Sequence, residues 1–223
     1  MSWGSNDAGV PWQIDPAYEA DFSTEHARGR IANRSAGVFR TAYLPYTLAD
    51  VDLTVNVQTD QVALGDWINA TAEARYVDSA NYLSARLEFR TSGNYSVSLY
   101  QVVEGSSVVL GTFVNGAYSA SSPINLRLQV RGENARAKAW PVATPEPDHW
   151  QVGRKTSHLT PGRIGLGSVL SSGNTNVDPE VSFGSLVIPN PQQFRVIRSV
   201  NGVRKGHLPG SDVRLAHPSV LAL

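Results

Sequence analysis

Apolar and polar residues alternate at every second position along much of this 223-residue chain. Between Asp50 and Gln58, valines and a leucine occupy every second position, and polar residues stand between them. Residues two apart in a strand point to the same side, so this pattern predicts an antiparallel strand with one buried face. The stretches Leu83–Arg90 and Asn125–Arg131 repeat the pattern, whereas helical periodicity is almost absent.

Turn signals separate these stretches from further candidate strands. Examples are Ser92-Gly93-Asn94 and Gly132-Glu133-Asn134, whose residue types favour tight turns. Many short strands with no helices between them indicate an all-β sandwich or jelly roll. The further predicted strands are Val38–Leu44, Trp67–Val77, Tyr95–Val102, Val108–Val114, Arg136–Trp140, Arg163–Leu170 and Val181–Ile188.

The sequence Pro189-Asn190-Pro191 divides the chain into two predicted domains. Residues 1–188 are expected to form the β-sandwich, and residues 189–223 a small C-terminal β-hairpin appendage. Within the appendage, Asn201-Gly202 suits the two left-handed positions of a type I′ hairpin turn. So short a segment cannot bury a core alone, and we expect it to pack on a neighbouring chain.

Composition argues against several classes of function. The chain has no cysteine, which excludes disulfides, zinc ribbons and thiol catalysis. Its 19 basic and 19 acidic residues cancel, which argues against sequence-independent nucleic-acid binding. No apolar run approaches the roughly 20 residues that span a bilayer, and the first residues lack the pattern of a secretory signal. We therefore expect no nucleic-acid partner and no membrane insertion.

The residue patterns of common enzymes are also missing. Glycosidases on β-sandwiches use closely spaced carboxylates on one strand face, whereas Glu73 and Asp78 are five residues apart and so point to opposite sides of an ideal strand. The five histidines show no metal-ligand spacing, and no G-x-S-x-G motif is present. We therefore predict a protein that is not an enzyme and has no metal site and no cofactor.

The outward positions of the central strands carry arginine, glutamate and tyrosine, which can bind sugar hydroxyls and stack on sugar rings. A solvated polar face is the competing interpretation. Among the tryptophans, Trp140 is expected in the core, whereas Trp67 follows a polar turn and is expected to be the most exposed. The candidate ligand-binding residues are Trp67, Arg75, Arg86, Glu88, Tyr100, Arg127 and Gln129, with Arg90 on the same outward face.

Three segments carry a resemblance to a known family. They are the opening W-G-x-x-D-x-G-x-x-W from Trp3 to Trp12, the block Asn81–Leu87, and the series from Leu126 through Gly162–Leu166 to Val181–Leu186. In their order and spacing, residues 1 to about 188 resemble the concanavalin A-like or laminin-G-like jelly rolls of actinobacterial proteins and their phages. Residues 198–223 resemble the C-termini of minor tail proteins of such phages.

The resemblance implies a non-enzymatic minor tail protein or tail-tip module, located in the virion, that binds host cell-envelope carbohydrate. Its implied partners are other virion tail proteins and further copies of itself, with a trimer suggested by analogy to tail fibres. A purely structural tail or fibre component without glycan binding is the alternative. A carbohydrate-active enzyme is a more distant one.

Two features depart from the family pattern. Relatives usually begin with an Asp-x-Phe strand before the Trp-Gly pair, whereas this chain starts at Trp3-Gly4, so that strand is missing or the chain is a piece of a longer protein. Many relatives close with Phe-Asp-Asp, whereas Phe183 is followed by Gly184-Ser185. A calcium site that relies on those carboxylates is therefore not implied.

Overall fold

The computed structural model describes residues 3–6 and 9–189. The chain divides into two units, Met1–Pro189 and Asn190–Leu223. The predicted C-terminal appendage falls, apart from Pro189, outside the described residues.

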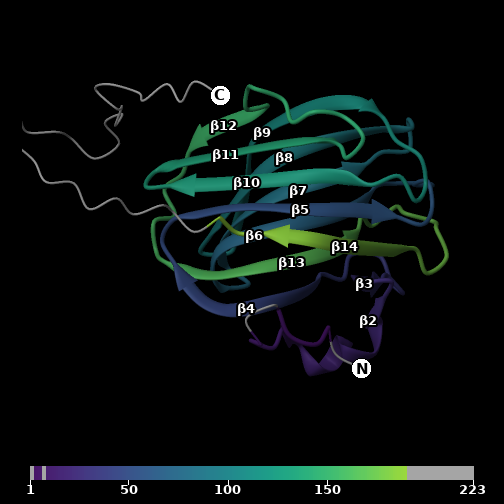
Figure 1. The fold of residues 1–223 in the computed structure, drawn as a ribbon, viewed down its shortest axis with the longest axis horizontal. Helices are drawn as coiled ribbons and strands as arrows, with labels where there is room; N and C mark the ends of the chain where they lie inside the picture. The colour runs from purple at the N-terminus through teal and green to yellow at the C-terminus, as the bar shows by residue number, and fades with distance from the viewer. Residues whose placement is uncertain (1–2, 7–8, 190–223) are drawn as a thin grey trace, which may run out of the picture. The chain divides into compact units, whose positions relative to one another are not determined.

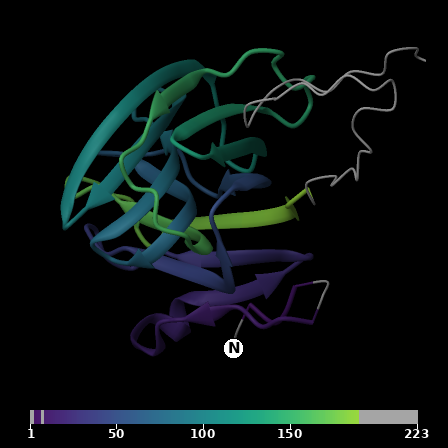
Figure 2. The ribbon, with the colours of Figure 1, turned by 90° about the vertical axis from the view of Figure 1, so that its left-hand side faces the viewer.

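Two seven-stranded antiparallel sheets form the first unit, and Figures 1 and 2 show them as two facing layers. Each sheet is named after its central strand, β6 or β5. The β6 sheet contains, in spatial order, β1 (Gln13–Ile14), β4 (Arg40–Leu48), β13 (Gly162–Leu170), β6 (Ile68–Asp78), β7 (Asn81–Phe89), β8 (Asn94–Val103) and β9 (Ser106–Ala117). The β5 sheet contains β12 (Val152–Lys155), β11 (Asn134–Pro141), β10 (Ile124–Arg131), β5 (Val51–Thr59), β14 (Glu180–Val187), β3 (Arg28–Ala32) and β2 (Phe22–Glu25).

The core lies between the sheets and is built from the alternating apolar positions. On β5, Val51, Leu53 and Val55 are at most 4% exposed, and the polar residues between them face outward. The β6 sheet contributes the alanines of β6 and the larger Leu83 and Leu87 of β7 to the same core. The predicted all-β jelly-roll sandwich is confirmed, because the period of two places one complete apolar face of each sheet inside.

All of the predicted strands are present, but the sequence did not indicate β1, β2, β3 or β12. The turn that joins β2 to β3 explains part of this omission. His26 and Ala27 have φ angles of 50° and 58°, the left-handed region that asparagine and glycine usually occupy in such turns. The hairpin therefore carries no local signal, and its position depends on the burial of Phe22 and Ile31 in the core.

A bulge in β6 overturns one prediction about the outward face. Arg75 has a φ of 52°, and the pairing of β6 with β7 shifts register after Ala74. The Arg75 side chain is consequently directed into the protein, where the residue is only 1% exposed. It donates hydrogen bonds to the carbonyls of Ala49 (2.6 Å), His158 (2.8 Å) and Gly132 (2.8 Å). Arg75 thus connects three loops and is not available to a ligand.

Trp3 of the opening motif is part of the core. Its ring lies 5.4 to 5.6 Å from the rings of Trp12, Phe22 and Phe183. A side chain at Gly29 would meet the Trp3 ring at 2.7 Å, so only glycine leaves room for it. The described part of the chain contains no helix long and apolar enough to cross a membrane; its one helix, η1 (Pro16–Asp21), has six residues.

Candidate functional site

The outward face of the β6 sheet brings polar side chains together in rows. Alanines and leucines of β6 and β7 fill the core, which leaves the intervening positions on the outer side. β8 adds Tyr100 opposite Ser84 and Ser98 opposite Arg86. Three cross-strand pairs of β6 and β7 lie on this face: Glu73 with Ser84, Thr71 with Arg86, and Asn69 with Glu88.

Two glycines of β13 allow neighbouring side chains to close over the face. A Cβ atom at Gly165 would lie 2.7 Å from the Tyr43 ring, and one at Gly167 would lie 2.6 Å from Thr41 Oγ1. Because β13 runs between β4 and β6, these missing side chains let Tyr43 and Thr41 of β4 reach toward Glu73. The glycines therefore shape the site.

A pocket of about 280 Å³ lies at this end of the face. Three tyrosines form a row along it, with ring centroids 4.1 Å apart for Tyr43 and Tyr76 and 5.7 Å apart for Tyr76 and Tyr82. The Arg163 guanidinium stacks on Tyr43 at 4.7 Å and on Tyr76 at 5.1 Å. The lining residues are Asp15, Tyr18, Phe22, Phe39, Thr41, Tyr43, Glu73, Tyr76, Ser79 and Tyr82.

Glu73 is a buried carboxylate with one unused oxygen. The residue is 1% exposed, and its Oε1 accepts long hydrogen bonds from Thr71 (3.3 Å) and Thr41 (3.5 Å). Its Oε2 has no hydrogen-bond partner among the described residues. Burial raises the pKa of Glu73 to about 7, although the Tyr43 hydroxyl and the positive charge of Arg86 act in the opposite direction.

Two further polar atoms near Glu73 are buried and unpartnered. They are Ser84 Oγ, directly across the strand pair, and Arg86 Nε on the next outward position of β7. The Arg86 guanidinium is held in place by stacking on Tyr100 at 4.0 Å. Of the four unpartnered buried side-chain atoms in the described residues, three therefore lie in this cluster. Such atoms usually mark a place where water or a ligand completes the hydrogen bonds.

Glu88 lies on the same face, but its hydrogen bonds are complete. Its carboxylate accepts from Ser96 Oγ (2.6 Å), the Tyr100 hydroxyl (3.1 Å) and Arg90 Nη2 (3.3 Å). Its position on β7 is four residues from Ser84, the partner of Glu73, or about 13 Å along the strand. The two carboxyl groups of a retaining glycosidase are about 5 to 5.5 Å apart, and those of an inverting one no more than about 9.5 Å. Glu73 and Glu88 do not form such a pair.

Three of the predicted ligand-binding residues lie on the outward face of the β6 sheet, namely Arg86, Glu88 and Tyr100, and Trp67 directly precedes β6. Trp67 is only partly exposed, because the Arg90 guanidinium stacks 4.5 Å from its ring centroid. Trp140 is 7% exposed, as expected of a core residue. Arg90 also bonds Ser96, and so connects Trp67 to the Glu88 cluster.

Arg127 and Gln129, in contrast, lie on the other sheet, so the outward positions predicted on the central strands do not form one surface. Both belong to β10 of the β5 sheet. Alternation identifies which residues of a strand point outward, but it does not identify the sheet to which the strand belongs. The binding surface predicted from the sequence is therefore divided between opposite sides of the sandwich.

The outward face of the β5 sheet is internally hydrogen-bonded. Arg127 donates two hydrogen bonds of 2.9 Å to the Asp52 carboxylate and a third, of 2.6 Å, to Glu146. Gln129 donates to Asp52 and accepts from Arg136 Nε. Burial alone would raise the pKa of Asp52, but the hydrogen bonds from Arg127 and Gln129 outweigh it and lower that pKa.

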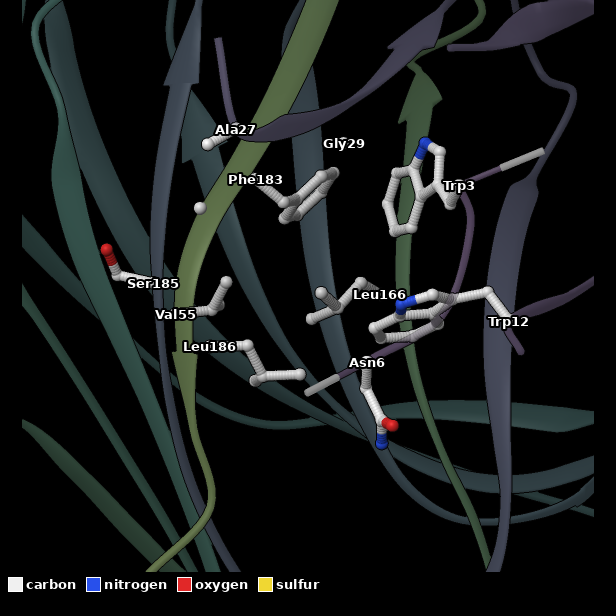
Figure 3. Close-up of a pocket in the computed structure, with 11 residues that line it drawn as sticks. Trp3, Asn6, Trp12, Ala27, Gly29, Val55, Leu166, Phe183, Ser185 and Leu186 are labelled. Carbon is white, nitrogen blue, oxygen red and sulfur yellow. The ribbon is translucent and has the colours of Figure 1, made fainter. Parts of the chain in front are cut away.

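A second pocket, of about 270 Å³, opens between the two sheets near the N-terminal segment (Figure 3). Figure 3 shows Val55, Leu166, Phe183 and Leu186 directed into the same space. Val55 and Leu166 belong to opposite sheets, so this pocket is an opening in the apolar core. Of its polar lining residues, Asn6 is hydrogen-bonded to Tyr46 and to the Val10 amide, and Ser185 is exposed. It lacks the unpartnered buried polar atoms of the Glu73 pocket.

Among residues 3–6 and 9–189, no group of three or more histidine, aspartate or glutamate side chains could hold a metal ion. The residues of the site that sequence reasoning missed are Glu73, Ser84 and the three pocket tyrosines. One signal was available, because Glu73 stands among the alternating alanines of β6 at an outward position. Its missing hydrogen bond is a property of the folded chain and has no sequence signature.

No family model and no curated protein matches this chain. Solved structures do match. Carbohydrate-binding module CBM66 from Bacillus subtilis has a TM-score of 0.59 at 12% identity, covering 85% of this chain and 99% of that one. The β-glucanase of Bacillus licheniformis has a TM-score of 0.57 at 13% identity, with 83% and 94% covered. The CBM2 module of the evolved Dit of Lactobacillus casei BL23 phage J-1 has a TM-score of 0.52 at 11% identity, with 82% and 92% covered. These comparisons show that residues 3–6 and 9–189 adopt the concanavalin A-like jelly-roll fold.

Proposed function

We propose that this protein is a non-enzymatic carbohydrate-binding module that holds a glycan on the outward face of its β6 sheet. The observation that supports this proposal most strongly is the cluster of three buried polar atoms without hydrogen-bond partners among the described residues, Glu73 Oε2, Ser84 Oγ and Arg86 Nε. A sugar hydroxyl both donates and accepts a hydrogen bond, so one hydroxyl or a neighbouring pair can satisfy the carboxylate and the guanidinium together. The adjoining tyrosine row offers flat apolar surface for the sugar ring.

Absence of catalysis is part of this proposal. Hydrolysis of a glycosidic bond requires a second carboxyl group at a fixed distance from the first. Glu88 is too far along β7 and is already saturated. Asp15, at the rim, is exposed, and its carboxylate caps η1 through the Ala17 amide. The fold is shared with a β-glucanase, but fold alone does not carry activity.

The biological setting that we propose is the tail of a virion, where the module is a minor tail or tail-tip protein that attaches to host cell-envelope carbohydrate. The resemblance to actinobacteriophage tail proteins supports this setting. So does the likeness of the fold to a carbohydrate-binding module within a phage Dit protein. The partners would then be other tail proteins and further copies of this chain, with a trimer suggested by analogy.

A glycan array that includes oligosaccharides from actinobacterial cell walls tests the binding proposal. We expect retention of at least one oligosaccharide, with an affinity at least about tenfold weaker for Arg86→Ala, since a hydrogen bond to a charged group contributes about 1.5 to 3 kcal/mol. The matched control is Arg127→Ala on the opposite face, which should bind as the parent chain does. Absence of any retained glycan would contradict the proposal.

A structural role in the tail is the second candidate, and the edge strand β9 favours it. All twelve residues of β9 are uncharged, and Val108, Val109, Phe113 and Val114 are 40% to 52% exposed. An apolar, uncharged sheet edge can pair with another chain. Sedimentation of the parent chain and of Val109→Lys tests this role. A parent chain that stays monomeric at every concentration would count against it.

A further inference from the structure

The buried carboxylate of Glu73 links the proposed site to pH. Its position is set by four strands: β6 carries it, β7 faces it, and β4 reaches it across β13. β13 contributes Gly165 at this position, which carries no charge, and Arg163 of the same strand stacks on Tyr43 and Tyr76 of the pocket. The side chains that surround Glu73 on this face are Thr41, Tyr43, Thr71, Tyr76, Tyr82, Ser84 and Arg86.

The neighbours of Glu73 can donate hydrogen bonds, but none of them neutralises it. The hydroxyls of Thr41 and Thr71 both approach Oε1, at 3.5 and 3.3 Å. The positive charge of Arg86 acts on the carboxylate, while its guanidinium is stacked on Tyr100 at 4.0 Å. The hydroxyls around Glu73, including that of Tyr43, and the charge of Arg86 favour the ionised carboxylate, but burial outweighs them. No donor from the described residues reaches Oε2.

We propose that a ligand hydroxyl supplies this missing hydrogen bond to Glu73 Oε2, and that binding therefore expels a proton from the site. This inference rests on the proposed glycan-binding function. An ionised carboxylate accepts a hydrogen bond about twice as strongly as a neutral acid does, so the ligand selects the ionised form. Since burial raises the pKa of free Glu73 to about 7, both forms are populated near neutral pH before the ligand arrives.

The thermodynamic linkage between proton binding and ligand binding gives the direction in which affinity changes with pH. A ligand that prefers the ionised form lowers the pKa of Glu73 in the complex, and affinity must then rise with pH until free Glu73 is fully ionised. Between pH 6 and pH 8 the affinity should rise about tenfold, and at pH 7 binding should release about half a proton per site. Above pH 8 the affinity should be constant.

Calorimetry with neutral oligosaccharides released from purified actinobacterial cell-wall polysaccharide tests the inference. Titrations at pH 6, 7 and 8, each in two buffers of different ionisation enthalpy, give both the affinity and the number of protons released. Glu73→Gln keeps the shape of the side chain but cannot ionise. Its affinity for the oligosaccharide should therefore not change between pH 6 and pH 8, and its binding should release no proton. Glu88→Gln is the matched control on the same face and should keep the pH dependence of the parent chain.

The outcomes separate the two proposals. Binding that is independent of pH in the parent chain, without proton release, would overturn the inference but leave glycan binding intact. A pH dependence that survives in Glu73→Gln would overturn it as well, because another group would then be titrating. If no oligosaccharide bound at any pH, both proposals would fail. Circular dichroism of each variant checks that it is folded. NMR of the Glu73 carboxyl resonance in the unaltered protein measures its titration directly, with and without the oligosaccharide.

Discussion

The outward faces of the two sheets are built from the same kinds of side chain but differ in how completely these are hydrogen-bonded. On the β5 sheet, Asp52 receives donors from Arg127 and Gln129. On the β6 sheet, Glu73 and Arg86 lie on neighbouring strands, yet each retains an unpartnered buried atom. A complete network stabilises the fold, whereas an incomplete one is available to a ligand.

The same contrast appears in the pKa values of the two acids. Burial dominates at Glu73 and raises its pKa to about 7. Burial also acts on Asp52, but the Arg127 and Gln129 hydrogen bonds outweigh it and lower the pKa. The two carboxylates therefore make opposite contributions to stability as pH changes.

The largest expected effect concerns Glu73 and stability. Its pKa is higher in the folded chain than in the unfolded chain, so folding binds a proton between about pH 4.5 and 7, and stability falls as pH rises through this window. Glu73→Gln removes this loss. Relative to the parent chain, the variant should gain about 3 kcal/mol in unfolding free energy between pH 4.5 and 8. Urea denaturation of both chains at the two pH values measures the gain. If the unfolding free energies of variant and parent chain differed by the same amount at pH 4.5 and pH 8, the raised pKa of Glu73 would be contradicted.

A smaller effect of opposite sign is expected on the β5 sheet. Asp52→Ala leaves Arg127 and Gln129 without their shared acceptor and should cost about 1 to 3 kcal/mol of stability at pH 7. The folded pKa of Asp52 is lowered, so its contribution is complete above the unfolded pKa of about 4 and is lost as pH falls further. Denaturation of both chains at pH 7 and pH 3 checks this. Unchanged stability at pH 7 would mean that the network is not structural.

The smallest effect tests how glycine shapes the site. An added methyl group in Gly165→Ala would lie 2.7 Å from the Tyr43 ring and force it away from Glu73. We expect a loss of about 1 kcal/mol in stability and about a tenfold loss in glycan affinity. Gly153→Ala on β12 is the matched control, because its nearest neighbour would be the Arg136 Cβ at 3.8 Å. Equal affinity in the two variants would exclude Tyr43 from the site.

Sequence alternation was sufficient to predict the sandwich, because each strand needs one apolar face and the period of two identifies it. It was not sufficient for Arg75, since a single left-handed residue in β6 reversed the side to which that side chain points. It also could not separate Arg127 from Arg86, because strand order is set by long-range pairing. The sequence therefore predicted the kind of surface but not the positions that share it.

Glu73 illustrates a different limit. Its outward position follows from the pattern of β6, but its importance depends on a hydrogen bond that none of the residues in 3–6 and 9–189 supplies. A sequence does not show whether the hydrogen bonds of a carboxylate are complete in the folded chain. Only the arrangement of β4, β13, β6 and β7 around the side chain distinguishes them.

The most direct measurement is a crystal structure of the protein with a bound cell-wall oligosaccharide at a resolution that shows each hydroxyl. Our account predicts a sugar ring against the tyrosine row, with hydroxyl oxygens within hydrogen-bond distance of Glu73 Oε2 and Arg86 Nε. A sugar bound instead on the β5 sheet, beside Trp150 and Arg136, with Glu73 Oε2 still unpartnered, would contradict it.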